Sequence, residues 1–391
     1  MLRSLYSGIS GLRSHQEMLD VTGNNIANVN TVGFKSSSTV FQDTLSQMTQ
    51  GAGGPQTGIG GTNPAQIGLG VQVAGVSTNF AQGSAQATGK ATDLMISGDG
   101  FFVTRLGNDT LYTRAGAFDF DADGRLVSAD GKIVQGYPAT NGVVNEGGQL
   151  GDIVLPLDAA APAVRTTTAG VTGNLPSDTA VGGTRVREAT VYDASGAKHT
   201  LSLTYTRTAT GWTVAGNDGQ GGTGTSALTF GTDGKLTAGG SMNVNGIAVD
   251  MTQLTGFASL DAASIANQNG HEAGSLQGYS IAKDGTVVGT FSNGSSLAIG
   301  RIALATFANP AGLEKTGASG YRATSNSGNA TIGAPGSPGV GQLASGTLEM
   351  SNVDLSQEFT NLIVAQRGFQ ANARIITTSD EVLQELTNLK R

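Results

Sequence analysis

The chain has no cysteine among its 391 residues, so neither disulfides nor thiolate metal ligands are available to it. Histidine is nearly as scarce. His15, His199 and His271 lie far apart in the sequence, and no two of them have the spacing of paired metal ligands. These absences disfavour zinc binding and histidine-centred catalysis. The sequence therefore predicts no metal, no cofactor and no enzymatic activity.

Aromatic residues make up only 5% of the chain and charged residues only 13%. The formal net charge is −7, and lysine and arginine are scattered, which argues against a phosphate-binding surface and a nucleic-acid partner. No apolar run reaches the roughly 18 residues of a membrane-spanning helix, so no membrane insertion is expected. Residues 1–12 lack the continuous apolar run and the cleavage site of a signal peptide, which predicts export, if any, without a cleaved signal.

Glycine is abundant, with 60 residues, and threonine, serine and asparagine are frequent. This composition is typical of many short strands joined by tight turns, so an all-β middle is expected. Residues 49–70 are rich in glycine and proline and carry neither charge nor helical periodicity. They predict an extended linker or a long irregular hairpin.

Both ends of the chain show apolar residues at alternating three- and four-residue steps, the pattern of a narrow coiled-coil seam. The predicted inter-helix or assembly seam consists of Leu2, Leu5, Ile9, Leu12, Leu19 and Ile26 at the start, and Leu355, Phe359, Leu362, Phe369, Ala373, Ile376 and Leu383 at the end. Two ordinary amphipathic helices packed on a core would give a similar pattern. The presence of the seam at both extremities favours pairing of the two ends.

Capping residues predict where these helices end and begin. Asparagines and a glycine cluster where the first apolar pattern stops, so the first helix should end between about Val29 and Gly33. Near the other end, Ser351 and Asp354 offer N-cap acceptors before the second pattern. The second helix should begin near Asp354.

Short alternating runs fill the middle of the chain, among them Thr184 to Tyr192 and Thr286 to Phe291. Hairpin turns are predicted at Gly98-Asp99-Gly100, Asp123-Gly124 and Asp130-Gly131. The predicted fold is mainly β with a terminal α-helical coiled coil, in nested discontinuous domains. The predicted division is a coiled-coil domain of residues 1–30 and 352–391, a linker or hairpin of residues 31–70, an inner β domain of residues 71–146 and 270–351, and an inserted outer β domain of residues 147–269.

One acidic segment resembles a metal site. Asp119, Asp121 and Asp123 have the alternating spacing of the first ligands in an EF-hand calcium loop. No glutamate follows where that loop would need its bidentate ligand, and Asp-Gly between alternating strands is commoner as a turn. The turn interpretation is therefore favoured.

Three segments, in this order, resemble the family of flagellar rod and hook proteins. The first runs from Asn24 to Lys35 and reads NNIANVNTVGFK, the second comprises DLMISGDGFFV from Asp93 and YTRAG from Tyr112, and the third begins GTLEMSNVDL at Gly346. The motif residues singled out are Asn24, Asn25, Ile26, Ala27, Asn28, Gly33, Phe34, Ser351, Asn352, Val353 and Asp354. Rod proteins of this family are usually shorter, so the additional residues 147–269 favour a hook-type member.

The resemblance implies a structural subunit that polymerises into a curved helical tube around an export channel and transmits torque from rod to filament as a universal joint. It implies an extracellular place in the flagellum, type III export, and as partners further copies of the chain, rod proteins, hook cap and hook-filament junction proteins and the export apparatus. The alternatives are a distal rod protein of the same family and, more remotely, a β-rich extracellular adhesin or enzyme.

Overall fold

The computed structural model divides into two compact units. Unit 1 comprises Met1–Leu155, Ser280–Val288 and Ala298–Arg391, and unit 2 comprises Pro156–Tyr279 and Gly289–Leu297. The residues described are 2–55, 57–58, 60–140, 142–156 and 161–388. The finer division predicted from the sequence stays a prediction, and residues 1, 56, 59, 141, 157–160 and 389–391 of its ranges lie outside the described residues.

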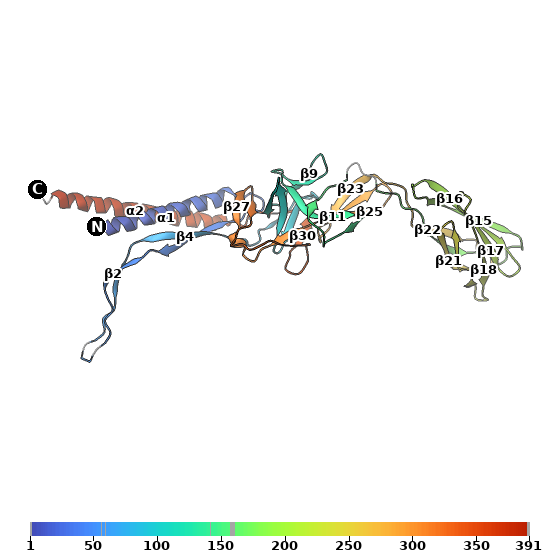
Figure 1. The fold of residues 1–391 in the computed structure, drawn as a ribbon, viewed down its shortest axis with the longest axis horizontal. Coiled ribbons are helices and arrows are strands. Elements are labelled where there is room, and N and C mark those ends of the chain that lie inside the picture. The colour runs from blue at the N-terminus through green and yellow to red at the C-terminus, as the bar shows by residue number, and fades with distance from the viewer. Residues whose placement is uncertain (1, 56, 59, 141, 157–160, 389–391) are drawn as a thin grey trace. The chain divides into compact units, whose positions relative to one another are not determined.

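Two long helices of unit 1, α1 (Leu2–Ala27) and α2 (Leu355–Asn388), lie side by side and antiparallel (Figure 1). Small residues permit their close approach. A Cβ atom added to Gly8 would lie 3.3 Å from Ile376 Cγ1, and one added to Gly11 would lie 2.7 Å from the Asn372 side chain. Neither described helix is long and apolar enough to cross a membrane.

The helix boundaries match the prediction at one end and differ at the other. Helix α2 begins at Leu355, and Asp354 caps it, because the Asp354 carboxylate accepts hydrogen bonds from the backbone N–H groups of Ser356 (2.8 Å) and Gln357 (3.2 Å). Helix α1 ends at Ala27, earlier than predicted, because Asn28 starts a series of turns instead of a further helical turn.

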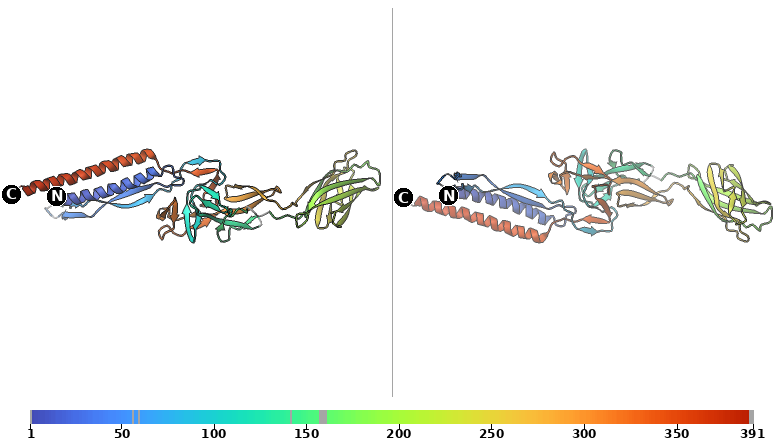
Figure 2. Two further views of the ribbon diagram at one scale, coloured as in Figure 1. Left: turned by 90° about the horizontal axis from the view of Figure 1, so that it is seen from above. Right: turned by 90° about the horizontal axis from the view of Figure 1, so that it is seen from below.

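A β-ribbon covers α1 on another side. Strands β1 (Ser37–Asp43) and β4 (Val71–Thr78) pair antiparallel along their length, and beyond them β2 (Ser46–Gln50) pairs with β3 (Ala65–Gly68) (Figure 2). Ser10 Oγ on α1 accepts a hydrogen bond of 3.3 Å from the backbone N–H of Val71. The segment predicted as linker or hairpin therefore forms a hairpin, which continues to Thr78 and packs on the first helix.

The rest of unit 1 is a β structure around a large sheet whose strand order differs from the chain order. From β25 onward the order is β25-β11-β7-β8-β28-β27, with shorter strands attached to β7, β9, β10, β11 and β26, whereas β6 with β30 and β5 with β31 form separate two-stranded sheets. The strands are β5 (Ala85–Ala87), β6 (Leu94–Ser97), β7 (Phe101–Leu106), β8 (Asp109–Thr113), β9 (Phe118–Phe120), β10 (Leu126–Ser128), β11 (Ile133–Thr140), β12 (Val143–Val144), β13 (Gly151–Asp152), β26 (Leu304–Thr306), β27 (Glu314–Gly317), β28 (Gly320–Arg322), β29 (Thr331–Gly333), β30 (Gln342–Ser345) and β31 (Thr347–Glu349), with a short 3₁₀ helix at Pro310–Gly312. Three further strands contain residues of both units: β23 (Leu276–Ile281), β24 (Thr286–Phe291) and β25 (Ser296–Ile302).

Two of the three predicted turns are hairpin turns. Asp123-Gly124 joins the paired strands β9 and β10, and Asp130-Gly131 joins β10 to β11. The prediction at Gly98-Asp99-Gly100 is wrong, because the strand before it, β6, pairs instead with β30 near the C-terminus, with Leu94 opposite Ser345. A distant segment thus replaces the local partner of β6.

Unit 2 is a two-sheet β structure. One sheet has the order β15-β16-β17-β18-β19 and the other β20-β21-β14-β22, in which β14 and β21 are parallel. The strands are β14 (Thr168–Asn174), β15 (Thr184–Tyr192), β16 (Lys198–Arg207), β17 (Trp212–Asn217), β18 (Thr223–Phe230), β19 (Leu236–Ala238), β20 (Ser241–Val244), β21 (Ile247–Thr255) and β22 (Ser264–Gln268). One core cluster contains side chains of both sheets, among them Val171, Leu203 and Trp212.

The single tryptophan makes unit 2 testable within the whole chain. Leu203 is fully buried in the core cluster that also contains Trp212, so Leu203→Ala should lower the free energy of unfolding of this unit by about 2–5 kcal/mol. Urea unfolding of the full chain, followed by tryptophan fluorescence, measures the change. The exposed Thr225→Ala is the control on the same sheet and should change stability by less than about 0.5 kcal/mol. Equal effects of the two substitutions would contradict the assignment of this core.

Candidate functional site at the junction of the terminal segments

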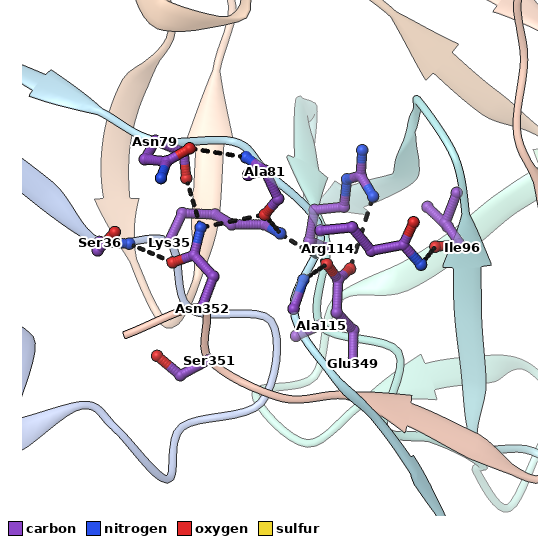
Figure 3. A network of polar contacts seen from close by, with 12 residues as sticks. Lys35, Ser36, Asn79, Ala81, Ile96, Arg114, Ala115, Glu349, Ser351 and Asn352 are labelled. Atoms are coloured by element: carbon purple, nitrogen blue, oxygen red, sulfur yellow. Dashed lines mark hydrogen bonds and ion pairs between the residues drawn. The ribbon is translucent and has the colours of Figure 1, made fainter. Parts of the chain in front are cut away.

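The first and third family-like segments meet in unit 1, although they lie at opposite ends of the sequence (Figure 3). The backbone N–H of Gly33 donates a hydrogen bond of 2.8 Å to the carbonyl oxygen of Glu349. Two asparagines and a buried group of charged side chains extend this contact. The junction joins both helices, the β-ribbon and the β structure of the unit.

Asn25 connects three elements at the end of α1. Its side chain is 1% exposed, donates to the carbonyl oxygen of Ser37 (2.7 Å) and accepts from the Ser37 backbone N–H (3.0 Å). The same amide nitrogen donates to Glu358 Oε1 on α2 at 3.0 Å. Asn25 therefore holds the start of β1 and the first turn of α2 against α1, and only a side chain with both donor and acceptor can do so.

Asn352 performs a similar function before α2. Its Oδ1 accepts a 2.8 Å hydrogen bond from the backbone N–H of Ser36. Its Nδ2 donates to the carbonyl oxygens of Asn79 (2.9 Å) and Ala81 (3.0 Å). The side chain thereby ties the C-terminal segment to both chain segments that flank the β-ribbon (Figure 3).

Three charged side chains, Lys35, Arg114 and Glu349, form what we term the junction cluster. Lys35 Nζ lies 2.6 Å from Glu349 Oε1, and both side chains are fully buried. Lys35 also donates to the carbonyl oxygen of Ala81 at 2.8 Å, and Glu349 Oε1 accepts from the backbone N–H of Gly83 at 2.9 Å. Arg114 Nη1 lies 3.5 Å from Glu349 Oε2.

Burial dominates the electrostatics of this cluster. It lowers the pKa of Lys35, and the hydrogen bond and charge of Glu349 oppose that effect. Burial likewise lowers the pKa of Arg114, again opposed by the Glu349 carboxylate. Charges taken out of water are costly unless they are paired and hydrogen-bonded. Glu349 is the shared counter-charge that permits both cations to be buried here.

Gly33 is required by the geometry of the junction. Its φ of +66° lies in the left-handed region that favours glycine, and an added Cβ would lie 2.4 Å from the backbone nitrogen of Ala115. The first segment therefore crosses directly over the chain that follows β8 and carries Arg114. A side chain at position 33 would separate the two.

The remaining motif residues shape the approach to the junction. Asn28 Nδ2 donates to the carbonyl oxygen (2.9 Å) and side chain (2.7 Å) of Asn24, which satisfies groups at the end of α1. Lys315 Nζ lies 5.3 Å from the centre of the Phe34 ring, a cation–π contact. Ile26, Phe34, Ser351 and Val353 are half-buried, whereas Ala27 and Asp354 are exposed.

The predicted seam residues are only in part brought together. Half-buried positions are Leu5, Leu12, Leu19, Ile26, Leu362, Ala373, Ile376 and Leu383, whereas Ile9, Leu355, Phe359 and Phe369 are exposed. Leu2 lies in α1. The two helices also approach closely at glycines: an added Cβ would lie 3.3 Å from Ile376 at Gly8, 2.7 Å from Asn372 at Gly11 and 2.5 Å from His15 at Gly368. A role of the exposed apolar residues in assembly stays a prediction.

The acidic segment at Asp119 to Asp123 is a turn held by its own chain. Asp121 Oδ1 accepts from the backbone N–H groups of Asp123 (3.0 Å) and Arg125 (2.7 Å). Arg125 also pairs with the carboxylates of Asp121 (2.8 Å) and Asp123 (2.7 Å). Within the described residues, no group of three or more acidic, histidine or cysteine residues has metal-site geometry.

Sequence reasoning did not identify the junction cluster. Lys35, Arg114 and Glu349 all lie within the quoted segments, yet 314 positions separate Lys35 from Glu349. A single sequence carries no signal that pairs residues so far apart. One chemical signal was available. Lysine and glutamate are almost never fully buried unless they are paired, so a lysine and a glutamate that each stand among apolar and small neighbours are candidates for a buried ion pair.

The cluster predicts unequal effects of removing its members. Glu349→Gln leaves two buried cations without a counter-charge, so the free energy of unfolding of unit 1 should fall by about 3–5 kcal/mol. Lys35→Met leaves the Glu349–Arg114 pair in place and should cost less. Calorimetry of the full chain measures the transition of unit 1, and Trp212 fluorescence should show unit 2 unchanged. A larger loss from Lys35→Met would refute the role of Glu349 as the shared counter-charge.

The close approach at Gly33 has a matched control. Gly107 has a similar φ of +62°, but an added Cβ would meet nothing within 4 Å. Gly107→Ala should therefore cost only the left-handed strain of about 1–2 kcal/mol. Gly33→Ala carries the same strain and a backbone clash, and should cost about 1–3 kcal/mol more in calorimetry. Equal losses would show that the chain segments at Ala115 can separate freely.

Comparison with known protein families agrees with the order of these segments. Residues 5–35 match the family described as Flagella basal body rod protein, and residues 95–171 match Flagellar hook protein FlgE/F/G D1 domain. Residues 344–389 match Flagellar basal body rod FlgEFG protein C-terminal. The first and third of these matches contain the two sides of the junction.

Curated relatives match over the whole chain. The flagellar hook protein FlgE of Borreliella burgdorferi is 40% identical, and that of Treponema pallidum 37%, each with all of both chains covered. The flagellar basal-body rod protein FlgG of Bacillus subtilis is 36% identical, again with full coverage of both. Among solved structures, the Helicobacter pylori flagellar hook protein FlgE2 has a similar fold, with a TM-score of 0.50 and 15% identity over 68% of this chain and 100% of that chain. The chain belongs to the family of flagellar hook and basal-body rod proteins.

Proposed function

We propose that this chain is the structural subunit of a bacterial flagellar hook. It polymerises into a curved helical tube that surrounds the export channel and transmits torque from rod to filament as a universal joint. The observation that carries the proposal is the full-length match, at 40% and 37% identity, to two relatives named flagellar hook protein. The mainly β fold with paired terminal helices supports it.

The subunit acts mechanically and not as an enzyme. The polar and charged side chains of the junction are used to join segments: Asn25 and Asn352 bond to backbone groups, and Glu349 neutralises buried cations. A catalytic site needs polar groups that converge on a substrate. Here they converge on the chain's own backbone, which makes the junction a rigid connection between the helices and the β structure.

Exposed apolar residues on the helices are the proposed contacts between copies. Phe359, Ile363 and Val364 are each more than half exposed on α2, and Tyr6 is 67% exposed on α1. Exposed apolar surface of this kind marks an interaction site. Contacts that use different surfaces on the two copies repeat without closing and produce a helical polymer. The seam residues Ile9, Leu355, Phe359 and Phe369 belong to this surface.

The proposed place of the subunit follows from its assembly. It is exported by the flagellar type III apparatus without a cleaved signal and lies outside the cell in the hook. Its partners are further copies of itself, the rod below, and the hook cap and hook-filament junction proteins above. The absence of cysteine fits passage through the channel as an unfolded chain, because no disulfide has to be broken.

A distal rod protein is the second candidate. The relative named flagellar basal-body rod protein FlgG matches the full chain at 36% identity, close to the hook relatives. A rod subunit would share the helices, the ribbon and the junction. The two candidates differ in where the polymer lies and in whether it bends.

Electron microscopy of flagellar basal bodies distinguishes them. A strain without the gene should assemble a complete rod and stop there, because the hook has no subunit. In the parent strain, an antibody against residues 147–269 should decorate a short curved segment outside the cell. Label on the rod, or complete hooks in the mutant, would exclude the hook assignment. Restoration of hooks by the wild-type gene is the control.

A further inference from the structure

A cavity of about 510 Å³ lies in unit 1 beside the junction cluster. Aromatic side chains line it, and they pack edge to face: the ring centres of Phe101 and Phe80 lie 5.5 Å apart, and those of Phe101 and Phe307 lie 5.8 Å apart. Such walls hold an apolar group. Arg114 also lines the cavity, so a buried charge borders the space beside these aromatic rings.

The Arg114 guanidinium is only partly satisfied by its own chain, because Glu349 supplies a counter-charge but no close hydrogen bond. Its side chain is 3% exposed, and within the described residues neither Nε nor Nη1 has a hydrogen-bond partner. Its contacts are the 3.5 Å approach to Glu349 and the position of its Cζ 5.3 Å from the centre of the Phe101 ring. One terminal nitrogen points away from Glu349 (Figure 3). Buried donors without partners are costly, and a guanidinium more so than a neutral group.

The charge of the junction cluster is also unbalanced. Lys35 and Arg114 carry two positive charges, and Glu349 carries one negative charge. Lys35 takes the nearer carboxylate oxygen at 2.6 Å, whereas Arg114 stands 3.5 Å from the other. Within these three residues one positive charge is therefore in excess, and the further negative charge that acts on Arg114 is the carboxylate of the exposed Asp99. The group that would complete this site is an anion.

We propose that the cavity binds a carboxylate attached to an apolar group, with Arg114 bound to the carboxylate and the apolar group between Phe80, Phe101 and Phe307. Arginine binds a carboxylate through two parallel hydrogen bonds, which suits a guanidinium with free donors. Two sources supply this chemistry. One is an acidic residue beside an apolar residue on a neighbouring copy in the proposed polymer, and the other is a free organic acid.

Asp99 is the competing group. It lines the same cavity, its side chain is exposed, and its charge acts on Arg114. It repels an incoming carboxylate, so its removal should strengthen binding. If Asp99 itself were the partner of Arg114, its removal would also free the guanidinium and raise the affinity, but it would destabilise unit 1 as well. Calorimetric unfolding of Asp99→Asn separates these cases, because an exposed competing carboxylate can be removed with little change in stability.

Calorimetric titration of the soluble full-length chain with phenylacetate at neutral pH tests the site. Phenylacetate should bind at one site, and phenylacetamide, its neutral counterpart, should not bind measurably. Arg114→Met should fold, because it leaves the neutral Lys35–Glu349 pair, and should lower affinity about 10- to 100-fold. Asp99→Asn should raise affinity. Equal binding of the acid and the amide, or unchanged binding by Arg114→Met, would overturn the proposal, as would no binding of phenylacetate.

Polymerisation in vitro then separates the two sources. If a neighbouring copy supplies the carboxylate, which rests on the proposed function, phenylacetate and Arg114→Met should both slow polymer growth, with phenylacetamide as the control. If a free acid is the ligand, polymer growth should be unchanged while the titration still shows binding. The titration uses single subunits, so its failure is distinguishable from failure of the hook assignment.

Discussion

The burial of Glu349 between two cations is the interaction on which unit 1 depends. Its carboxylate is held by Lys35 from the first segment, Arg114 from the β structure and the backbone N–H of Gly83. Burying these charges costs several kcal/mol for each ion unless each finds a partner. The segments can therefore reach their native positions only together. The helices and the β structure cannot be placed independently of each other at this point.

The asparagines and glycines of the junction serve the same constraint. Asn25 bonds to backbone groups at the first residue of β1, and Asn352 bonds to backbone groups in the segments that flank the β-ribbon, where a buried N–H or C=O would otherwise lack a partner. Gly33 allows the chain to pass close to the backbone of Ala115, because a Cβ atom at position 33 would lie only 2.4 Å from the Ala115 nitrogen. The asparagines and the glycine of the motif thus satisfy or accommodate the backbone around the junction cluster.

The sequence predicted what is local and missed what is distant. The start of α2 and strand β15 follow from an aspartate cap and from alternation, which short stretches of chain determine by themselves. The turn at Gly98 was predicted wrongly because β6 pairs with β30, about 245 residues away. The motif residues singled out from the sequence include Asn25, Gly33 and Asn352 of the junction but not Lys35 or Glu349, whose ion pair exists only because the fold brings the two ends of the chain together.

The seam shows why periodicity alone does not identify a contact. An apolar stripe on a helix can contain residues that contact the other helix of the same chain and residues that contact another subunit. The structure of a single chain shows only the first kind of contact. In this chain α1 and α2 approach closely at Gly8, Gly11 and Gly368, whereas Phe359 and Ile363 are more than half exposed. Small residues bring two backbones close, whereas large ones fill the space between more distant elements. In the proposed polymer, neighbouring copies would cover the large apolar side chains that the single chain leaves exposed. Burial of this surface would favour the assembled state over the free subunit.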